Sequence, residues 1–288
     1  MERFRSWLFA PGDSLDKCLK ATQSAADQVI WDLEDAVSNG RKLQARQNVI
    51  TLLEQLPASA HTPWIRVNAL DTSWGINDLV SVASAFSSRK PRWVIPKADQ
   101  SSPIILQRIA EQKQLREGEW VLLIESAQGF WDLLHAQSSW RIPGSCRLAF
   151  GALDYIHDIG ATGLTDSSVL VVPQTLLVWT SRVWHWPAPV DSVFSSIHDV
   201  MELGDSARKA RAMGMAGKMV IHPAQIDPVN NAFLPSMQDY QWATSVIKAM
   251  ESQGVTLVGG AMVDRPVLER ARQILEEYRD FSNQPETT

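Results

Sequence analysis

Cysteine, long apolar runs and an apolar leader are all scarce in this sequence. It holds only two cysteines, Cys18 and Cys146, which lie far apart and form no CxxC pair. This argues against a thiolate metal site or a disulfide framework and makes a reducing cytoplasm the expected compartment. No stretch approaches the roughly 18 apolar residues of a membrane helix, and the first residues lack an apolar signal core. We expect a soluble, cytoplasmic protein with no membrane partner.

An excess of positive charge is also missing. The chain carries 27 basic and 32 acidic residues, and Lys and Arg form no continuous stripe. Nucleic acid is therefore not an expected partner. With 288 residues, 45% of them hydrophobic, the chain is long enough for a sizeable core in one large domain or two ordinary ones.

Short apolar or β-branched runs alternate along the chain with longer amphipathic stretches, such as residues 42–56 and 206–213. This pattern predicts βα units around a parallel sheet. The eight runs span residues 6–10, 28–33, 64–67, 92–96, 120–125, 147–151, 189–193 and 218–221. Eight repeats predict a closed TIM (β/α)8 barrel over residues 1–235. A C-terminal helical extension follows over residues 236–288, able to pack on a neighbouring subunit.

Two of these runs lead to a carboxylate. Glu125 closes Trp-Val-Leu-Leu-Ile-Glu, and Asp154 follows Leu-Ala-Phe-Gly-Ala-Leu. In a barrel of this class the active site forms at the carboxyl ends of the strands. Because two acids in one mouth are costly without a cation, the pair predicts a site for a divalent ion such as Mg²⁺.

Further polar residues follow the other runs, and acids mixed with an arginine suit a metal-bound oxyanion. For any single residue, an ion pair at the barrel rim is an equally good interpretation, and the joint pattern favours a site. We expect His222, which precedes Pro223, to orient or bond the backbone rather than to catalyse. The remaining mouth residues are Asp13, Asp32, Glu34, Asp35, Arg66, Asn68 and Lys97.

These residues also carry a family resemblance. The segments lie in family order and span nearly the whole chain, and together they resemble the citrate lyase beta subunit-like branch of the HpcH/HpaI aldolase family. They are residues 9–13, 31–37, 65–68, 96–97, 123–126, 150–154, 217–223 and 262–267.

The resemblance implies a Mg²⁺-dependent TIM barrel that cleaves or forms carbon–carbon bonds, often in 3-hydroxyacyl-CoA thioesters such as malyl-CoA or citramalyl-CoA. Glu125 and Asp154 match the two protein ligands of the metal. Arg66 matches the arginine that contacts the thioester or carboxylate oxygen and stabilises the enolate. The resemblance also implies a homotrimer.

The acidic segment Asp-Leu-Glu-Asp at residues 32–35 divides between two faces of a strand. Alternation points Asp32 and Glu34 to one side and Leu33 and Asp35 to the other, so only one pair is expected to face the centre directly. The resemblance implies that Glu34 and Asp35 hold metal-bound waters and orient their neighbours. Asp32 is expected to cap or to pair within the barrel.

Asp264 lies after the eighth run, just before a last predicted helix over residues 267–278, with Pro266 suited to its first turn. Its position is that of a good N-cap. In related lyases the matching aspartate reaches a neighbouring subunit and acts as acid or base on the acyl carbon. Both roles are compatible if the protein oligomerises.

Two departures from the family concern substrate binding. Ser14 and Leu15 follow Gly12-Asp13 where relatives often have Arg-Pro, and Gln174 stands at a position that is often basic. CoA binding is therefore less secure than the lyase chemistry, and an acyl carrier domain or a free acid could replace CoA.

Three functional interpretations follow. The leading one is a Mg²⁺-dependent lyase for a CoA thioester, which yields a 2-oxo acid and an acyl-CoA through an enolate. The second is a CoA-independent class II aldolase acting on pyruvate or another 2-oxo acid. The third is a non-catalytic binding protein, and the joint presence of Arg66, Glu125, Asp154 and Asp264 argues against it.

Overall fold

The computed structural model describes residues 2–57, 59–86, 89–110, 115, 118–136, 140, 142, 144–162, 168–253, 257–258 and 261–282. The chain divides into two compact units, Met1–Asn230 and Asn231–Thr288. Each unit has a hydrophobic core of its own. The sequence predicted a division after residue 235, and packing of the second unit on a neighbouring subunit stays a prediction.

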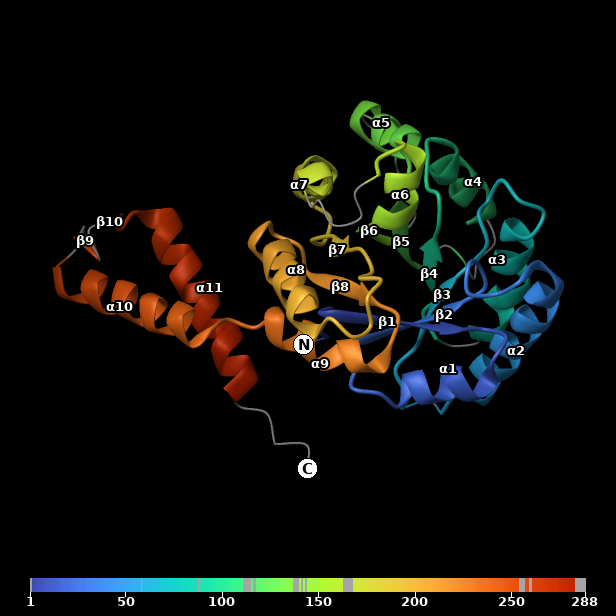
Figure 1. The fold of residues 1–288 in the computed structure, drawn as a ribbon, viewed down its shortest axis with the longest axis horizontal. Helices are drawn as coiled ribbons and strands as arrows, with labels where there is room; N and C mark the ends of the chain where they lie inside the picture. Colours follow the sequence, from blue (N-terminus) through green and yellow to red (C-terminus); the bar gives the residue numbers. More distant parts are fainter. Residues whose placement is uncertain are drawn as a thin grey trace. The chain divides into compact units, whose positions relative to one another are not determined.

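The first unit is a closed barrel of parallel strands in the order β1 to β8, as the repeat pattern predicted (Figure 1). Each strand pairs with the next one in the chain, and β8 closes the barrel against β1. The strands are β1 (Ser6–Pro11), β2 (Gln28–Asp32), β3 (Trp64–Arg66), β4 (Arg92–Ile95), β5 (Glu119–Ile124), β6 (Ser145–Phe150), β7 (Val190–Asp191) and β8 (Gly217–Val220).

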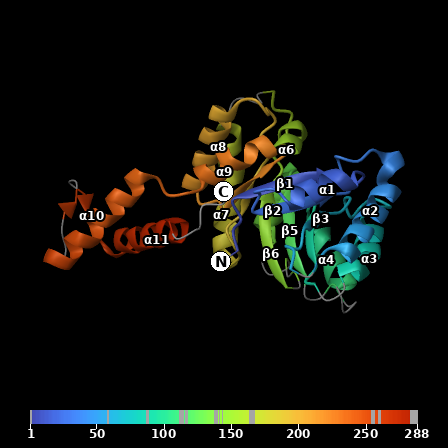
Figure 2. The ribbon, with the colours of Figure 1, turned by 90° about the horizontal axis from the view of Figure 1, so that it is seen from below.

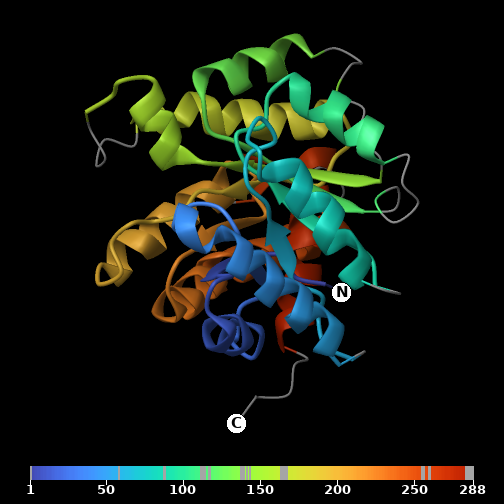
Figure 3. The same ribbon diagram turned by 90° about the vertical axis from the view of Figure 1, so that its right-hand side faces the viewer.

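Helices cover the outside of this barrel (Figure 3). A helix follows almost every strand, as βα units require. The helices are α1 (Leu15–Thr22), α2 (Lys42–Gln55), α3 (Gly75–Ala83), α4 (Ser101–Ile109), α5 (Ala127–His135), α6 (Ala152–Asp158), α7 (Ser168–Val183), α8 (Val200–Ala212) and α9 (Ile226–Ala232), with short 3-10 turns η1 (Asn39–Arg41), η2 (Ser84–Phe86) and η3 (Pro223–Gln225).

Apolar side chains fill the barrel interior. The rings of Trp7 and Trp64 lie 5.1 Å apart, and Val190 and Met219 close the layer from β7 and β8. Alternation along the strands then turns the neighbouring residues outward toward the helices. The carboxyl ends of all eight strands meet at one mouth of this packed cylinder, which is where polar side chains can gather.

The second unit is a helical hairpin with its own core. Helices α10 (Met237–Gln253) and α11 (Arg265–Ser282) lie side by side in both ribbon views and are connected through the short strands β9 (Leu257–Val258) and β10 (Ala261–Met262) (Figure 2). Their buried contact includes Ala243, Val246, Val263, Ala271 and Ile274. Among the described residues, no helix combines the length and the apolar character that crossing a membrane requires.

Candidate active site

Five charged residues lie at or just after the carboxyl ends of neighbouring strands. Asp32 ends β2, Arg66 ends β3, Lys97 follows β4, Glu125 follows β5, and Asp154 lies in the first turn of α6 after β6. Because the barrel is closed and parallel, these ends share one mouth.

Arg66 is the centre of an ion-pair network at this mouth. Its Nε and Nη2 each donate to an oxygen of Asp32 at 2.6 Å, while Nη1 lies 3.1 Å from Glu34 Oε2 and 3.5 Å from Asp35 Oδ2. Its guanidinium carbon lies 4.7 Å from the centre of the Phe9 ring. Although burial opposes the charged form, Asp32 and Glu34 raise the pKa of Arg66, so the site holds a fixed positive charge.

The acidic segment reaches Arg66 because β2 ends at Asp32 and the chain then turns. Asp32 Oδ1 accepts from the N–H of Glu34 at 2.9 Å, and its Oδ2 accepts from the N–H of Ala36 at 3.0 Å. Strict alternation thus stops at Asp32. The expectation that only one pair of acids faces the centre is wrong, since Glu34 and Asp35 contact the same guanidinium. Asp32 both caps this turn and pairs with Arg66, as expected.

Lys42 binds the main chain of the acidic segment, a contact that the sequence did not predict. Lys42 is 7% exposed, and its ammonium group donates to the carbonyls of Leu33 and Glu34, both at 3.1 Å, and to Asn68 Oδ1 at 2.5 Å. Asn68 in turn donates from its N–H and its Nδ2 to Asp78, at 3.0 and 2.6 Å. A lysine at the start of an amphipathic helix is usually exposed to solvent. The one sequence signal for this contact is that Lys42 follows the acidic segment, residues 32–35, within a few residues.

Glu34 and Glu125 are buried carboxylates, 5% and 3% exposed. Burial, chiefly, raises the pKa of Glu34 to about 7, although Arg66 and Lys97 oppose the rise. Burial and the nearby charges of Glu34 and Asp154 raise the pKa of Glu125 to about 8. Both oxygens of Glu34 have a cation at ion-pair distance, yet neither accepts a hydrogen bond from the described residues. The carboxylates that lie at this mouth therefore outnumber its cationic side chains.

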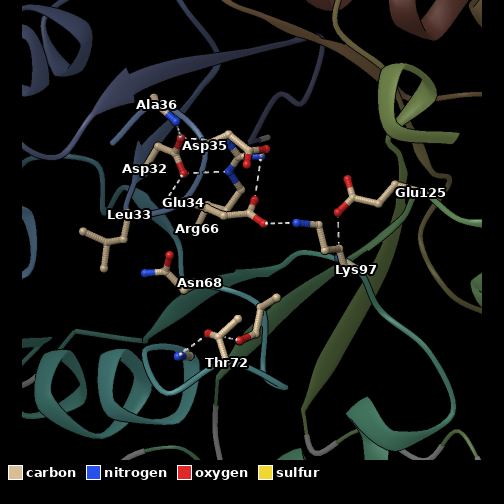
Figure 4. Close-up of polar contacts among 12 residues, drawn as sticks. Asp32, Leu33, Glu34, Asp35, Ala36, Arg66, Asn68, Thr72, Lys97 and Glu125 are labelled. Atoms are coloured by element: carbon tan, nitrogen blue, oxygen red, sulfur yellow. Dashed lines mark hydrogen bonds and ion pairs between the residues drawn. The ribbon is translucent and has the colours of Figure 1, made fainter. Parts of the chain in front are cut away.

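Lys97 connects the two buried acids. Its N–H donates to Glu125 Oε1 at 2.7 Å, and its ammonium group lies 3.2 Å from Glu34 Oε1. Figure 4 shows Glu34 between the guanidinium of Arg66 and the amine of Lys97, with Glu125 beyond. On its other side Glu125 meets Gly151, where an added Cβ would overlap the Cβ and Oε2 of the glutamate. The main chain after β6 therefore packs directly against this carboxylate.

Asp154 follows Gly151 by one helical turn, in the first turn of α6, and its side chain is exposed. It lies close enough to Glu125 to raise the pKa of that residue. Asp158, at the end of the same helix, accepts from the N–H of Ala127 at 2.7 Å and so caps α5. Of the predicted residues, the structure gathers Glu34, Asp35, Arg66 and Glu125 into one network, with Asp154 beside it.

Asp264 and His222 both bind main-chain groups. Asp264 precedes α11 in the second unit, and its Oδ1 accepts from the N–H of Val267 at 3.1 Å, which is the expected N-cap. Its predicted role in a neighbouring subunit stays a prediction. His222 accepts from the N–H of Ala224 at 3.2 Å and caps η3, in keeping with its exclusion from the catalytic set.

The two departures from the family pattern have structural explanations. Ser14 is the N-cap of α1. Gln174 donates to Asp191 Oδ1 at 2.8 Å, and the other oxygen of Asp191 lies 2.5 Å from the ammonium group of Lys218. Asp191 and Lys218 are 1% and 2% exposed, so Gln174 completes a buried pair between the barrel and α7. Neither residue offers a positive charge to a phosphate.

Comparison with known proteins identifies the family of this chain. A family model described as HpcH/HpaI aldolase/citrate lyase matches residues 5–223. The chain belongs to this family. A second model, described as a C–C bond lyase of the TIM-barrel fold, matches residues 169–282. The protein is therefore a carbon–carbon lyase by family.

Named relatives of this family member differ in activity. A (3S)-malyl-CoA thioesterase of Cereibacter sphaeroides is 31% identical over 94% of this chain and 93% of its own. The citrate lyase subunit beta of Escherichia coli is 30% identical over 94% of this chain and 92% of its own. The solved structure of CitE from Mycobacterium tuberculosis with magnesium, acetoacetate and coenzyme A has a TM-score of 0.80 at 28% identity and covers 96% of this chain and 98% of its own.

The donor set of this HpcH/HpaI family member fits a divalent cation. Glu125 and Asp154 offer hard oxygen atoms, and Asp154 lies close enough to Glu125 to affect its pKa. Among the described residues, no group of three or more His, Cys, Asp or Glu side chains could hold a metal ion. Mg²⁺ usually keeps several waters and few protein carboxylates, so two carboxylate ligands are sufficient for it.

Proposed function

We propose that this protein is a Mg²⁺-dependent lyase that cleaves or forms a 3-hydroxyacyl-CoA thioester of the malyl-CoA or citramalyl-CoA type. The products of cleavage are a 2-oxo acid and an acyl-CoA. The observation that carries the proposal is a buried carboxylate, Glu125, fixed by Lys97 and Gly151 beside Asp154, with the charge of Arg66 in the same mouth.

Two relatives support the choice of substrate class. An L-malyl-CoA/beta-methylmalyl-CoA lyase of Cereibacter sphaeroides is 28% identical over 96% of this chain. The Mycobacterium tuberculosis CitE structure contains magnesium, acetoacetate and coenzyme A. One relative at 28% identity is thus named for a CoA thioester, and another at 28% identity holds magnesium and coenzyme A.

Glu125 and Asp154 would hold Mg²⁺, which supplies Lewis-acid polarisation of the substrate's oxygen atoms. Arg66 stabilises the negative charge that develops on the thioester oxygen as the carbon–carbon bond breaks and an enolate forms. Asp32 fixes the plane of the guanidinium through two hydrogen bonds, so Arg66 need not reorganise during the reaction. Glu34 and Asp35 form ion pairs with its Nη1 atom.

Asp264, supplied by a neighbouring subunit of a homotrimer, gives a proton to the enolate carbon in cleavage and removes it in synthesis. The N-cap hydrogen bond from the N–H of Val267 uses only Oδ1 of this carboxylate. In this proposal the same residue caps α11 and completes the site.

The test is an assay of purified protein with malyl-CoA, citramalyl-CoA and citrate, following 2-oxo acid release with Mg²⁺ and with a chelator. Metal-dependent release from one thioester is the expected result. Asp154→Ala should abolish this release while the thermal unfolding transition remains. An active Asp154→Ala enzyme would contradict the metal assignment.

Thioester hydrolysis is a second candidate, because relatives at 31% identity are named (3S)-malyl-CoA thioesterase. Hydrolysis of malyl-CoA gives malate and free CoA, whereas lyase cleavage gives glyoxylate and acetyl-CoA. Product analysis therefore separates the two activities. Release of a 2-oxo acid only from CoA-free substrates would instead favour the class II aldolase, in keeping with Ser14 and Gln174 at positions where relatives are often basic.

A further inference from the structure

Lys97 has an unusual backbone conformation for its position. Its φ of 49° lies in the left-handed region, which is strained for an L-residue other than glycine. The other described non-glycine residue with positive φ, His185, lies two residues after Val183, the last residue of α7, where left-handed residues commonly end helices. Lys97 follows a strand and has no such explanation.

The left-handed turn redirects one main-chain N–H from the sheet to a side chain. Ala98 resumes pairing with β5 through Leu123, at 3.0 Å, whereas the N–H of Lys97 points to Glu125 Oε1 at 2.7 Å. Pro96 between β4 and Lys97 has no N–H. The strained conformation of Lys97 thus accompanies a hydrogen bond from its N–H to Glu125, the carboxylate that we assign to the metal.

The side chain of Lys97 forms an ion pair with Glu34, not with Glu125. Its ammonium group lies 3.2 Å from Glu34 Oε1, and the other oxygen of Glu34 lies 3.1 Å from Arg66. Without this amine, Arg66 alone would face Asp32, Glu34 and Asp35.

We propose that Lys97 is the positioning residue of this site: its main-chain N–H fixes Glu125 for the metal, and its amine fixes Glu34 against Arg66. The inference rests on the proposed function. Lys97 is not assigned a contact with the reacting atoms. Its main-chain contact with Glu125 and its amine contact with Glu34 can be disturbed by different substitutions.

The main-chain part is tested by Mg²⁺ titration calorimetry without substrate. Lys97→Met and Lys97→Val both lose the amine, but a β-branched residue is a much poorer occupant of positive φ. We expect Lys97→Met, and Lys97→Gly, which adopts this φ freely, to bind Mg²⁺ within about threefold of wild type. Lys97→Val should bind about tenfold or more weakly, as expected when a group that orients a metal ligand is displaced. Lys97→Thr, also β-branched, replaces the valine variant if that variant does not fold.

The amine part is tested by chemical rescue. Lys97→Met should lower kcat about 10–100-fold with a smaller change in KM. Lys97→Cys treated with 2-bromoethylamine regains an amine of nearly lysine length, while treatment with iodoacetamide gives a neutral side chain of similar length. Cys18 and Cys146 are buried, and burial raises the pKa of both thiols, so the reagents select residue 97. Wild-type protein carried through both treatments is the control.

The outcomes separate the two parts from each other and from the proposed function. Equal Mg²⁺ affinity of the methionine and valine variants would overturn the main-chain part. Equal activity of the two alkylated cysteine variants would overturn the amine part. Absence of Mg²⁺ binding or of lyase activity in the wild type would instead overturn the proposed function.

Discussion

Asp32 is the residue on which most of the mouth depends. It is fully buried, accepts two hydrogen bonds from Arg66, and accepts two more from the main chain of the acidic turn. Although burial favours the neutral acid, Arg66 and these N–H groups hold the pKa of Asp32 below its usual range. A single carboxylate therefore fixes both the guanidinium and the turn that carries Glu34 and Asp35.

Asp32→Asn should consequently damage both stability and turnover. The amide cannot accept from both donors of the guanidinium, which leaves a buried charge without its main partner and costs about 3 kcal/mol in free energy of unfolding. Activity should fall at least about 100-fold because Arg66 loses its fixed orientation. Urea unfolding and turnover measure the two effects.

The matched control is Asp16→Asn. Asp16 pairs with Lys20 at 2.8 Å on the surface of α1, where its side chain is 70% exposed. Such a pair contributes little, so the variant should remain within about 0.5 kcal/mol of wild type. An Asp32→Asn variant no less stable than this control would show that the network at the mouth is not structurally coupled.

At the scale of elements, the strands and the strand-end acids were predictable from the sequence. Strands buried on both faces leave continuous apolar runs, and a carboxylate directly after such a run, as at Glu125, is conspicuous. The contribution of Lys42 was not predictable, because its three partners are two carbonyls and an amide brought together only by the fold. The meeting of Glu34 and Asp35 at one guanidinium also depends on where β2 ends, which alternation alone does not locate.

At the N-cap of α11, Asp264, substitutions can separate a structural role from a chemical one. Asparagine caps helices about as well as aspartate does, whereas alanine does not. Asp264→Asn should therefore keep the free energy of unfolding within about 0.5 kcal/mol, and Asp264→Ala should lower it by about 1 kcal/mol. If the carboxylate is the acid and base of the reaction, both variants should lose activity about 100-fold or more.

Thermal unfolding together with turnover distinguishes the two roles of Asp264. Full activity in Asp264→Asn would mean that Asp264 serves only as the N-cap of α11, through its hydrogen bond with the N–H of Val267. Equal loss of stability in both variants would mean that the charge, rather than the hydrogen bond, holds the start of α11.

At the scale of the whole molecule, the buried acids make the stability of the metal-free protein depend on pH. The pKa of Glu125 is raised to about 8 and that of Glu34 to about 7 from an ordinary value of 4.5. The folded state therefore binds more protons than the unfolded chain between pH 4.5 and 8, and stability falls as pH rises through this window. We expect a loss of about 2–5 kcal/mol between pH 5 and pH 8.

Magnesium should oppose this loss. A cation competes with protons for the same carboxylates, so the rise in melting temperature on adding Mg²⁺ should be larger at pH 8 than at pH 6. Calorimetric scans with and without chelator measure both trends. Glu125→Gln should flatten the pH dependence, and an unchanged slope in that variant would assign the effect to other groups.

Assembly decides whether Asp264 completes the site of its own chain or of another. Asp154→Ala and Asp264→Asn should each be inactive as pure proteins, since one lacks the proposed metal ligand and the other the proposed acid. In a trimer in which each barrel receives Asp264 from a neighbour, co-expression of the two variants rebuilds complete sites wherever an intact barrel meets an intact Asp264. Random assembly makes about a quarter of the sites complete, so about a quarter of wild-type activity should return.

The control is co-expression of Asp154→Ala with Arg66→Ala. Both changes lie in the barrel, so this mixture should restore no activity. If the mixed Asp154 and Asp264 variants also stay inactive while sedimentation shows that they form one oligomer, then Asp264 acts within its own chain.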